Sequence, residues 1–287
     1  MAKSPKKPKH SFGIPKSILI LGKTLSILSP YLATLYAAKL FTTPVRFKTP
    51  RREMEMDTNS KQTLVHIPKI NKSVVIYEYG KSDKKIILVH GWSGRGTQLV
   101  NIANELLKQG YSVLTFDAPG HGKSPGKTTL MLEFIAIILQ LKKEYGPFEA
   151  GIGHSLGGMS LLNSMKQGLQ LNHLVTIGSG DIIKDIMDEF VEKLNLKLSI
   201  SDRMEQRFNK IYKQEMSDSS AYLAAKEIKI PVLIIHDKND LEVPVSCAHH
   251  IYENLSNGEL MITEKLGHRK IISDNDVINK IIGFIKP

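Results

Sequence analysis

The sequence has a single cysteine, Cys247, among its 287 residues, so no disulfide bond can form within the chain. A lone cysteine fits a reducing compartment such as the cytoplasm. No group of cysteines and histidines has the spacing of metal ligands either. We therefore expect no disulfide framework and no metal ion.

Acidic residues are absent from the first 52 positions, which carry eleven Lys and Arg. Removing these eleven from the 39 basic residues leaves 28, which balances the 28 Asp and Glu of the remaining chain. The net charge of +11 therefore belongs to a basic N-terminal arm, residues 1–52. Its field favours an anionic partner. Because the arm contains no recognised reading module, we expect no nucleic-acid partner.

The arm also lacks a long hydrophobic run. Its longest uncharged stretch, residues 24–38, has fifteen residues, fewer than the ~20 that span a bilayer. Ser29 followed by Pro30 is typical of a helix N-cap and first helical position, so we expect two short helices. Leucines in steps of three and four predict one apolar stripe along the segment: Leu21, Leu25, Leu28, Leu32 and Leu35.

Three interpretations of this stripe stay open. It could pack on the rest of the protein or cover its pocket. It could lie in the interface of an anionic membrane, with lysines on the lipid headgroups. It could be a signal or anchor segment, although the lysine and proline within it and the lack of a clear cleavage site argue against this. We expect a cytoplasmic protein, with membrane association through residues 1–52 as an alternative.

The strongest functional signal lies in the middle of the chain. Residues 153–158 read Gly-His-Ser-Leu-Gly-Gly and follow a short apolar run, Phe148 to Ile152. The pattern G-x-S-x-G between a strand and a helix predicts a strained turn that exposes the hydroxyl of Ser155 above the sheet edge. The glycines let the strand and helix backbones approach closely. The following helix would aim its N-terminal amides at the site.

A nucleophilic serine needs a histidine base and an acid that orients the base, and here they should follow the serine in the order acid, then histidine. Asp237 and Asp240 come directly after an apolar strand-like run. We expect Asp240, in the loop, to be the acid and Asp237 to end the strand and tie the turn. His268 follows a later strand-like run and is the expected base. His249 and His250 lie in an expected helix and are interpreted as its solvated face.

An oxyanion hole needs two backbone N–H groups aimed at the developing charge. Leu156, the residue after the nucleophile, would supply one of them. An earlier apolar strand ends in His90-Gly91-Trp92, which predicts that Trp92 supplies the other. Gly91 would allow the close approach and His90 would brace the loop.

The substrate pocket is expected to be bordered by side chains beside these motifs and in a helical insertion: His90, Gly91, His154, Met187 and Phe208. The segment Asp117 to Ser124 ends in Gly-Lys-Ser, as phosphate-binding loops do. It lacks the glycine that such loops need five positions earlier, where this chain has Asp117. We interpret the segment as a structural turn.

Strand and helix patterns alternate along the chain, which predicts an α/β fold with a mostly parallel, eight-stranded sheet and helices on both faces. The strands are expected at residues 63–67, 72–79, 85–90, 112–117, 148–152, 173–177, 232–237 and 259–264. The helices are expected at 98–109, 128–145, 155–166, 246–254 and 276–285. The first two strands, with no helix between them, should form an antiparallel start. Residues 181–229 carry only helical patterns, at 181–194 and 202–216.

Together these motifs, in this order over residues 62–287, closely resemble the α/β-hydrolase family. The resemblance implies the α/β-hydrolase fold, with residues 53–287 as the domain and 181–229 as a small helical lid. By analogy Ser155 is the nucleophile, His268 the base and Asp240 the acid. A serine at the elbow is similar to the lipase, esterase and serine-aminopeptidase-like branches, and departs from branches that carry aspartate there.

The resulting hypothesis is a serine hydrolase that cleaves carboxylic esters with small or medium acyl groups through an acyl-enzyme and without a cofactor. A serine aminopeptidase-like peptidase, which would need an acid such as Asp188 or Glu189 near its pocket, is one alternative. A thioesterase and an acyltransferase are others. From a different class, the fold could serve only for binding, although all three triad members are present. The sequence leaves the natural substrate and the oligomeric state open.

Overall fold

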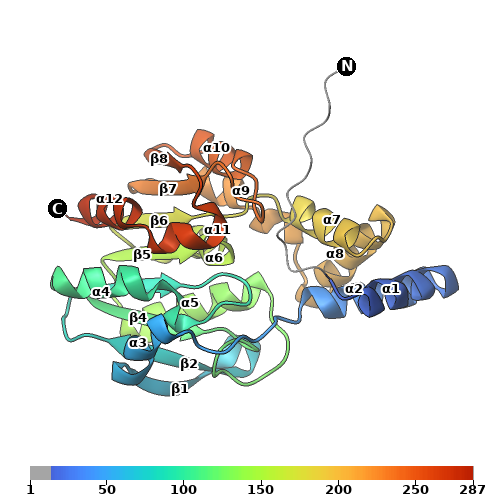
Figure 1. The fold of residues 1–287 in the computed structure, drawn as a ribbon, viewed down its shortest axis with the longest axis horizontal. Coiled ribbons are helices and arrows are strands. Elements are labelled where there is room, and N and C mark those ends of the chain that lie inside the picture. Colours follow the sequence, from blue (N-terminus) through green and yellow to red (C-terminus); the bar gives the residue numbers. More distant parts are fainter. Residues whose placement is uncertain (1–13, 287) are drawn as a thin grey trace.

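The computed structural model describes residues 14–286 and is built around one eight-stranded sheet (Figure 1). The spatial order is β1-β2-β4-β3-β5-β6-β7-β8, with β1 antiparallel to β2, β2 antiparallel to β4 and all other neighbours parallel. The strand bounds are β1 Lys61–Ile67, β2 Lys72–Tyr79, β3 Lys85–Val89, β4 Ser112–Asp117, β5 Ala150–His154, β6 His173–Ile177, β7 Val232–Asp237 and β8 Gly258–Thr263. All eight predicted strands, and the antiparallel start, are confirmed.

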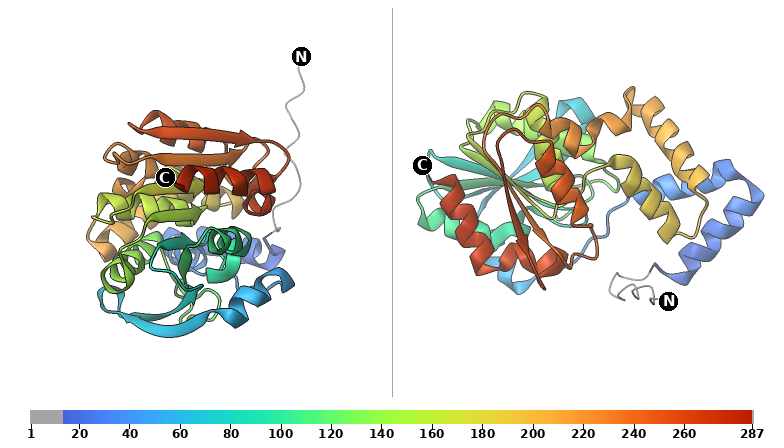
Figure 2. Two further views of the ribbon diagram at one scale, coloured as in Figure 1. Left: turned by 90° about the vertical axis from the view of Figure 1, so that its left-hand side faces the viewer. Right: turned by 90° about the horizontal axis from the view of Figure 1, so that it is seen from above.

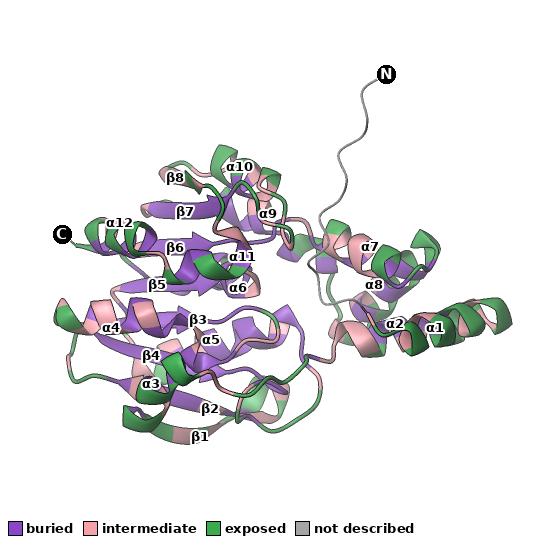
Figure 3. Cartoon of the chain, viewed as in Figure 1, coloured by how far each residue is buried: buried purple, intermediate pink, exposed green. Residues whose placement is uncertain are grey.

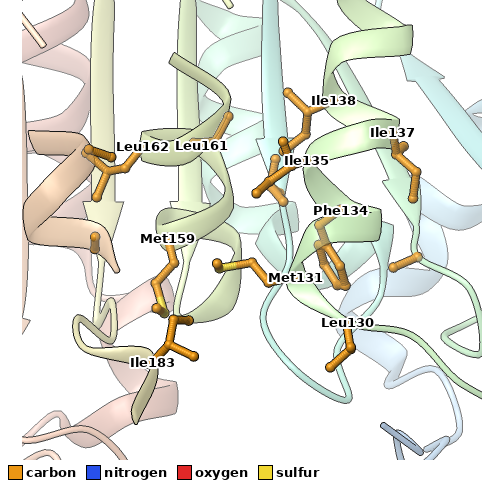
Figure 4. Packing of buried hydrophobic residues seen from close by; sticks show 14 of the residues in the cluster. Leu130, Met131, Phe134, Ile135, Ile137, Ile138, Met159, Leu161, Leu162 and Ile183 are labelled. Atoms are coloured by element: carbon orange, nitrogen blue, oxygen red, sulfur yellow. The ribbon is translucent and has the colours of Figure 1, made fainter. Parts of the chain in front are cut away.

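Helices cover both faces of the sheet, as the view from above shows (Figure 2). On one face lie α5 (Met131–Tyr145), α6 (Leu156–Lys166) and α10 (Ser246–Glu253), and on the other α4 (Val100–Lys108) and α12 (Asn275–Ile285). Alternate residues of each strand feed the two cores: Ile87 and Val89 of β3 join the first, whereas Ile86 and Leu88 join the second. The central strands are therefore buried on both sides (Figures 3 and 4).

Short helical elements complete the domain. They are η1 Arg51–Glu53, α3 Met54–Asn59, η2 Pro68–Ile70, η3 Gly96–Leu99, α11 Gly267–Lys270 and η5 Ile271–Ser273. The helix expected from residue 128 begins at Met131 instead. The N–H of Thr129 donates to the carbonyl of Thr42, 2.9 Å away in the N-terminal arm, and this contact holds residue 129 outside the helix.

Between β6 and β7 the chain forms the predicted helical insertion, here called the cap. It comprises α7 (Ile183–Lys193), α8 (Leu198–Tyr212), η4 (Met216–Ser219) and α9 (Ala221–Ala225). The cap lies beyond the carboxyl ends of the parallel strands (Figure 1). Met187, Val191 and Met204 of α7 and α8 are fully buried, so the two helices share an apolar core.

The arm contributes two helices, α1 (Lys16–Leu28) and α2 (Pro30–Phe41), which we call the helical hairpin. The predicted break is confirmed: Ser29 is the N-cap of α2 and its hydroxyl accepts from the N–H of Leu32. Ala33 and Ala37 of α2 are fully buried where α2 packs on α8, and α1 packs on α2. Residues 1–13 of the predicted arm lie outside the described part.

The prediction of a single apolar stripe along the hairpin is wrong. Because the chain reverses at Ser29, Leu25 and Leu35 turn partly inward while the other three leucines, Leu21, Leu28 and Leu32, are exposed. Among residues 14–286, no helix is long and apolar enough to cross a membrane.

After the hairpin, residues 42–50 run without helix along the sheet edge, and we call this segment the strap. The N–H of Val45 donates to the hydroxyl of Ser93, and the guanidinium of Arg46 donates to the carbonyls of Gly120, Ser124 and Gly126. The strap therefore holds two loops that follow β3 and β4.

Candidate active site

Ser155 occupies a strained turn between β5 and α6. Its backbone has φ 53° and ψ −119°, a conformation that a residue with a side chain adopts only when its surroundings enforce it. The N–H of Ser155 donates to the carbonyl of Ile177 at 2.8 Å, which fixes the turn to β6. The strained strand-turn-helix expected from G-x-S-x-G is thus confirmed.

Two glycines make this turn sterically feasible. A Cβ on Gly157 would lie 2.2 Å from the carbonyl oxygen of Val89, and one on Gly153 would lie 2.5 Å from the backbone of Gly157. Both distances are far inside van der Waals contact, so only glycine fits. The start of α6 consequently lies directly against the end of β3.

Asp240 and His268 form a buried pair beside this turn. Nδ1 of His268 lies 2.6 Å from Oδ2 of Asp240, and both side chains are buried. Oδ1 of Asp240 accepts the N–H groups of Glu242 and Val243 at 2.8 and 2.9 Å. With Nδ1–H donated to the carboxylate, the lone pair of the imidazole is on Nε2.

The carboxylate of Asp240 is held ionised. Burial raises its pKa, but the hydrogen bond and charge of His268 and the backbone N–H groups outweigh burial, so the pKa lies below its usual range. Asp237 ends β7 and has the structural role expected for it. Its carboxylate accepts from Asn239 N–H, Thr263 Oγ1–H and Leu266 N–H, so it ties the turn after β7 to the loop after β8.

The serine turn and the acid–histidine pair meet at Gly178 and His154. A Cβ on Gly178 would lie 3.2 Å from Nδ1 of His268. Nε2–H of His154 donates to the carbonyl of His268 at 2.8 Å, and the two rings lie 4.7 Å apart. Since His154 directly precedes Ser155, this bond links the loop of His268 to the nucleophile turn.

The loop after β3 approaches the serine from the other side. A Cβ on Gly91 would lie 3.0 Å from Cβ of Ser155, so the close approach predicted for Gly91 is present. Trp92 follows, with its ring partly exposed and 5.4 Å from the ring of His121. The N–H of the next residue, Ser93, donates to Nε2 of His121 at 3.0 Å. The oxyanion roles of Trp92 and Leu156 stay predictions.

Three buried histidines brace these loops in the neutral form. Burial lowers the pKa of His90 to about 4, and burial, with the neighbouring histidine charge, lowers the pKa values of His121 and His154 to about 3. Nε2 of His90 accepts the N–H of Ala118 at 3.1 Å, which confirms its bracing role. His90 and His154 are both buried and bonded to backbone, and their place beside the substrate pocket stays a prediction.

The two cap residues expected in the pocket, Met187 and Phe208, are both buried. Met187 belongs to the larger core cluster, which the cap shares with one face of the sheet. Phe208 lines a cavity of about 260 Å³ between α2, α8 and the start of α5. That cavity is bordered by residues such as Leu35 and Thr129 and by none of the triad candidates. Phe208 therefore packs where the arm meets the cap.

The Gly-Lys-Ser segment is structural, as predicted. The buried carboxylate of Asp117 accepts from the N–H of Gly96 and Lys123 at 2.6 Å each and from the hydroxyl of Tyr77 at 2.8 Å. The carboxylate fills the position where a phosphate-binding loop would keep space for its ligand. Among residues 14–286, no cluster of three His, Cys, Asp or Glu side chains could hold a metal ion.

Sequence reasoning missed two polar links. Glu53 and Arg95 form a buried ion pair at 3.2 Å that joins the end of η1, directly after the arm, to the loop after β3. Nδ1 of His250 lies 2.5 Å from Oδ2 of Asp181, and its ring stacks on Tyr222. The prediction that His250 lies on a solvated helix face is therefore wrong. Both pairs join residues more than forty positions apart, and no local pattern indicates such contacts.

Comparison with known proteins adds to this geometry. A model of the alpha/beta hydrolase family matches residues 86–221, which include β3, the nucleophile turn and most of the cap. Over these residues the chain matches the α/β-hydrolase family, and its fold is the α/β-hydrolase fold. This hydrolase and an esterase from Pyrococcus furiosus have a TM-score of 0.64 at 22% identity, over 85% of this chain and 95% of the other. For an esterase from Exiguobacterium antarcticum the TM-score is 0.62 at 18% identity, over 79% and 100%.

Among curated relatives, the hydrolase is 27% identical to the 2-hydroxy-6-oxononadienedioate/2-hydroxy-6-oxononatrienedioate hydrolase of Escherichia coli O81 (strain ED1a). The alignment covers 71% of this chain and 87% of the relative. At these identities the solved structures establish the fold, and the relatives establish that the chain is similar to hydrolases.

Proposed function

We propose that this α/β-hydrolase cleaves carboxylic esters with small or medium acyl groups, with Ser155 as nucleophile. The observation that carries the proposal is the buried pair of Asp240 and His268, 2.6 Å apart beside the strained turn of Ser155. An ionised acid on Nδ1 leaves Nε2 as the basic nitrogen, which is the tautomer a serine nucleophile requires.

The proposed reaction follows from these roles. The hydroxyl oxygen of Ser155 attacks the ester carbonyl while Nε2 of His268 takes its proton. His268 then returns the proton to the leaving alcohol, and an acyl group remains on Ser155. Water, deprotonated by His268, hydrolyses this acyl-enzyme, and Asp240 stabilises the imidazolium in both steps. No cofactor enters the sequence.

The negative charge of the tetrahedral intermediate falls on the former carbonyl oxygen. We assign its stabilisation to the N–H groups of Trp92 and Leu156, at the end of β3 and the first position of α6. One such donor is worth about 10²–10³ in turnover. The close contact of Gly91 with Ser155 supports this assignment, because it brings the two loops together.

Preference for small or medium acyl groups is supported by the cap. The apolar side chains that could hold a long acyl chain, Met187 and Met204 among them, are fully buried in the core that the cap shares with the sheet. The structural likeness to two proteins titled esterases is consistent with the ester assignment.

The aminopeptidase alternative is weakened by the charges of the cap. Asp188 lies 2.5 Å from Nζ of Lys184, and Glu189 lies 2.7 Å from Nζ of Lys193. Each carboxylate already has a lysine partner, so neither is suited to hold a substrate ammonium. The curated relatives favour a second candidate, a dicarboxylate like the one in their name.

The test combines labelling with turnover. Purified protein and Ser155→Ala are treated with a fluorophosphonate probe, then offered p-nitrophenyl esters of rising chain length and the 2-hydroxy-6-oxononadienedioate of the curated relatives. We expect labelling of the wild type alone and the fastest turnover with short esters. Labelling equal in both proteins would contradict the nucleophile. Labelling without ester turnover but with dienedioate turnover would favour the second candidate, and neither labelling nor turnover would favour a binding protein.

A further inference from the structure

The helical hairpin presents an apolar surface that no other described part of the chain covers. Six large side chains of α1 and the start of α2 are between 43% and 77% exposed. We call this surface the hairpin patch: Ile20, Leu21, Ile27, Leu28, Tyr31 and Leu32. Single exposed apolar residues are ordinary, but six on two adjoining helices form a contiguous surface of the kind that binds something.

The inner faces of these helices explain why the patch stays uncovered. A Cβ on Gly22 would lie 3.4 Å from the ring of Tyr36, and this close packing fixes which face of α1 turns toward α2. The hydroxyl of Tyr36 donates to the carbonyl of Ile18 at 3.1 Å. Stability of the hairpin therefore uses Gly22 and its neighbours, and the opposite face contributes little to folding.

Basic residues share the outer face with the apolar ones. Lys16, Ile20, Lys23 and Ile27 follow one another at intervals of four, three and four residues, which places them along one side of α1. Both lysines are exposed and without an ion-pair partner among the described residues. Residues 14–52 contain no Asp or Glu, so no carboxylate of the arm neutralises this face.

This combination fits a lipid surface better than a protein surface. Protein interfaces are enriched in aromatic residues, Met and Arg and depleted in Lys, whereas the patch is aliphatic except for one tyrosine and is bordered by lysines. Aliphatic side chains of an interfacial helix enter the boundary between headgroups and acyl chains, while lysine stems lie along the apolar layer and their ammonium groups reach the phosphates.

The position of the patch on the molecule is consistent with docking. The junction of α1 and α2, in blue, lies at the far right of the right-hand view, the end of the molecule opposite the C-terminus (Figure 2). The hairpin extends from the side of the sheet that carries the carboxyl ends of the parallel strands (Figure 1).

We propose that the hairpin patch, with Lys16 and Lys23, is a docking surface for an anionic lipid bilayer. The helices lie in the interface with the turn at Ser29 inserted, and the eleven positive charges of residues 1–52 attract the anionic headgroups. Docking does not depend on the proposed ester hydrolysis, because none of its residues belongs to the active site.

The test is sedimentation of the full-length protein with phosphatidylcholine vesicles that contain or lack phosphatidylglycerol, at low and high salt. We expect binding to the anionic vesicles that weakens with salt. Ile27→Asp combined with Leu28→Asp should lower the partition coefficient at least about tenfold, since two charges would enter the apolar layer. Lys16→Ala combined with Lys23→Ala should lower it by about tenfold or more. Ser155→Ala should bind like the wild type.

Matched controls alter equally exposed residues elsewhere. Leu64→Asp with Met54→Asp changes two exposed apolar side chains near β1, and Lys81→Ala with Lys84→Ala removes two charges from the loop before β3. We expect both controls to bind normally, and circular dichroism to give every variant the wild-type helix content. The proposal is overturned if the protein binds vesicles without anionic lipid equally well, or if the control variants lose as much binding as the patch and lysine variants. A change of oligomeric state in the patch variant without vesicle binding by the wild type would instead assign the patch to a second copy of the chain.

Discussion

The active-site edge and the helical hairpin are stabilised by opposite means. At the sheet edge, buried polar groups set the geometry: Asp117, Asp237 and Asp240 each accept two or more hydrogen bonds. The hairpin is stabilised by small apolar contacts, at Gly22, Ala33 and Ala37, and leaves its larger side chains outside. Polar networks fix positions to within fractions of an ångström, whereas apolar faces tolerate a change of partner. The comparison indicates one region built for chemistry and one for contact.

The largest effect is expected from Ser155→Ala at the sheet edge. Turnover should fall on the order of 10⁶-fold, because the nucleophile is lost while the fold is kept. A companion variant, Ser155→Gly, should be equally inactive yet unfold at higher temperature, since glycine adopts φ 53° without strain. Ester assays and thermal unfolding measure the two effects. Equal stability of the glycine and alanine variants would argue that the turn is unstrained.

Next in size is Asp240→Asn, compared with Asp237→Asn at the end of β7, three residues earlier. The first should lower turnover by about 10⁴-fold, because the amide no longer fixes the Nδ1–H tautomer of His268. The second should cost about 1–3 kcal/mol of stability, through its turn bonds, with turnover changed only modestly. Steady-state kinetics and denaturant unfolding separate the two. A similar loss of turnover in both variants would contradict the division of roles.

Acid should lower the free energy of unfolding already at pH values well above the pKa values of the carboxylates. The unfolded chain protonates His90, His121 and His154 below about pH 6.5, whereas the folded chain keeps them neutral until about pH 4 or 3. Unfolding therefore takes up protons as the pH falls, and stability should drop by about 1 kcal/mol per pH unit for each histidine. Residues 14–53 contain no histidine, so the hairpin lacks this sensitivity.

Denaturant unfolding between about pH 8 and pH 4 measures this slope. His121→Gln should reduce it by about one proton, and His249→Gln, at an exposed position, should leave it unchanged. The carboxylates affect stability only at lower pH. Because the pKa values of Asp237 and Asp240 are lowered, their contribution is present above about pH 4 and is lost as the pH falls through the folded pKa. A stability that is flat down to about pH 5 would contradict the buried neutral histidines.

A smaller effect is expected where the two regions are joined. Arg46→Ala removes three hydrogen bonds from the strap to the loops after β4 and should cost about 1 kcal/mol, since the side chain is largely exposed. Turnover should fall severalfold as the loop of Trp92 loosens. Lys48→Ala, an exposed neighbour on the strap, is the control. A wild-type rate for Arg46→Ala would mean that the strap does not position the site.

The smallest effect belongs to the hairpin. Ser29→Ala removes the N-cap bond of α2, which is long at 3.5 Å, and should cost about 0.5 kcal/mol. Hydrogen exchange of the first turn of α2 should speed up while ester turnover stays at the wild-type rate. Slower turnover in this variant would show that the hairpin influences the active site, which contradicts the separation of the two regions.

Much of the sheet and of the acid–histidine geometry could be predicted because each depends on local signals. Apolar runs in the sequence predict the strands. Ser155, Asp240 and His268 each follow such a strand, so the parallel topology brings them to the same edge of the sheet. The break at Ser29 is likewise local, since a cap and a proline define it.

Other features depend on contacts between distant residues and have no such signal. Met187 and Phe208 are apolar, which indicates that they are buried but not which residues bury them, and their place in the substrate pocket stays a prediction. His250 looked solvated because its partner Asp181 lies 69 positions away. The strap was missed for the same reason, since its bonds reach backbone carbonyls, which every residue offers.

The strap also gives the molecule a mechanical property. Residues 42–50 are a helix-free stretch, fastened at Val45 to Ser93 and at Arg46 to the loop that follows β4. A stretch without helix has no helical turns that could unwind to lengthen it. Tension on the hairpin therefore passes along the strap to Ser93, one residue from Trp92, before it reaches any strand of the sheet.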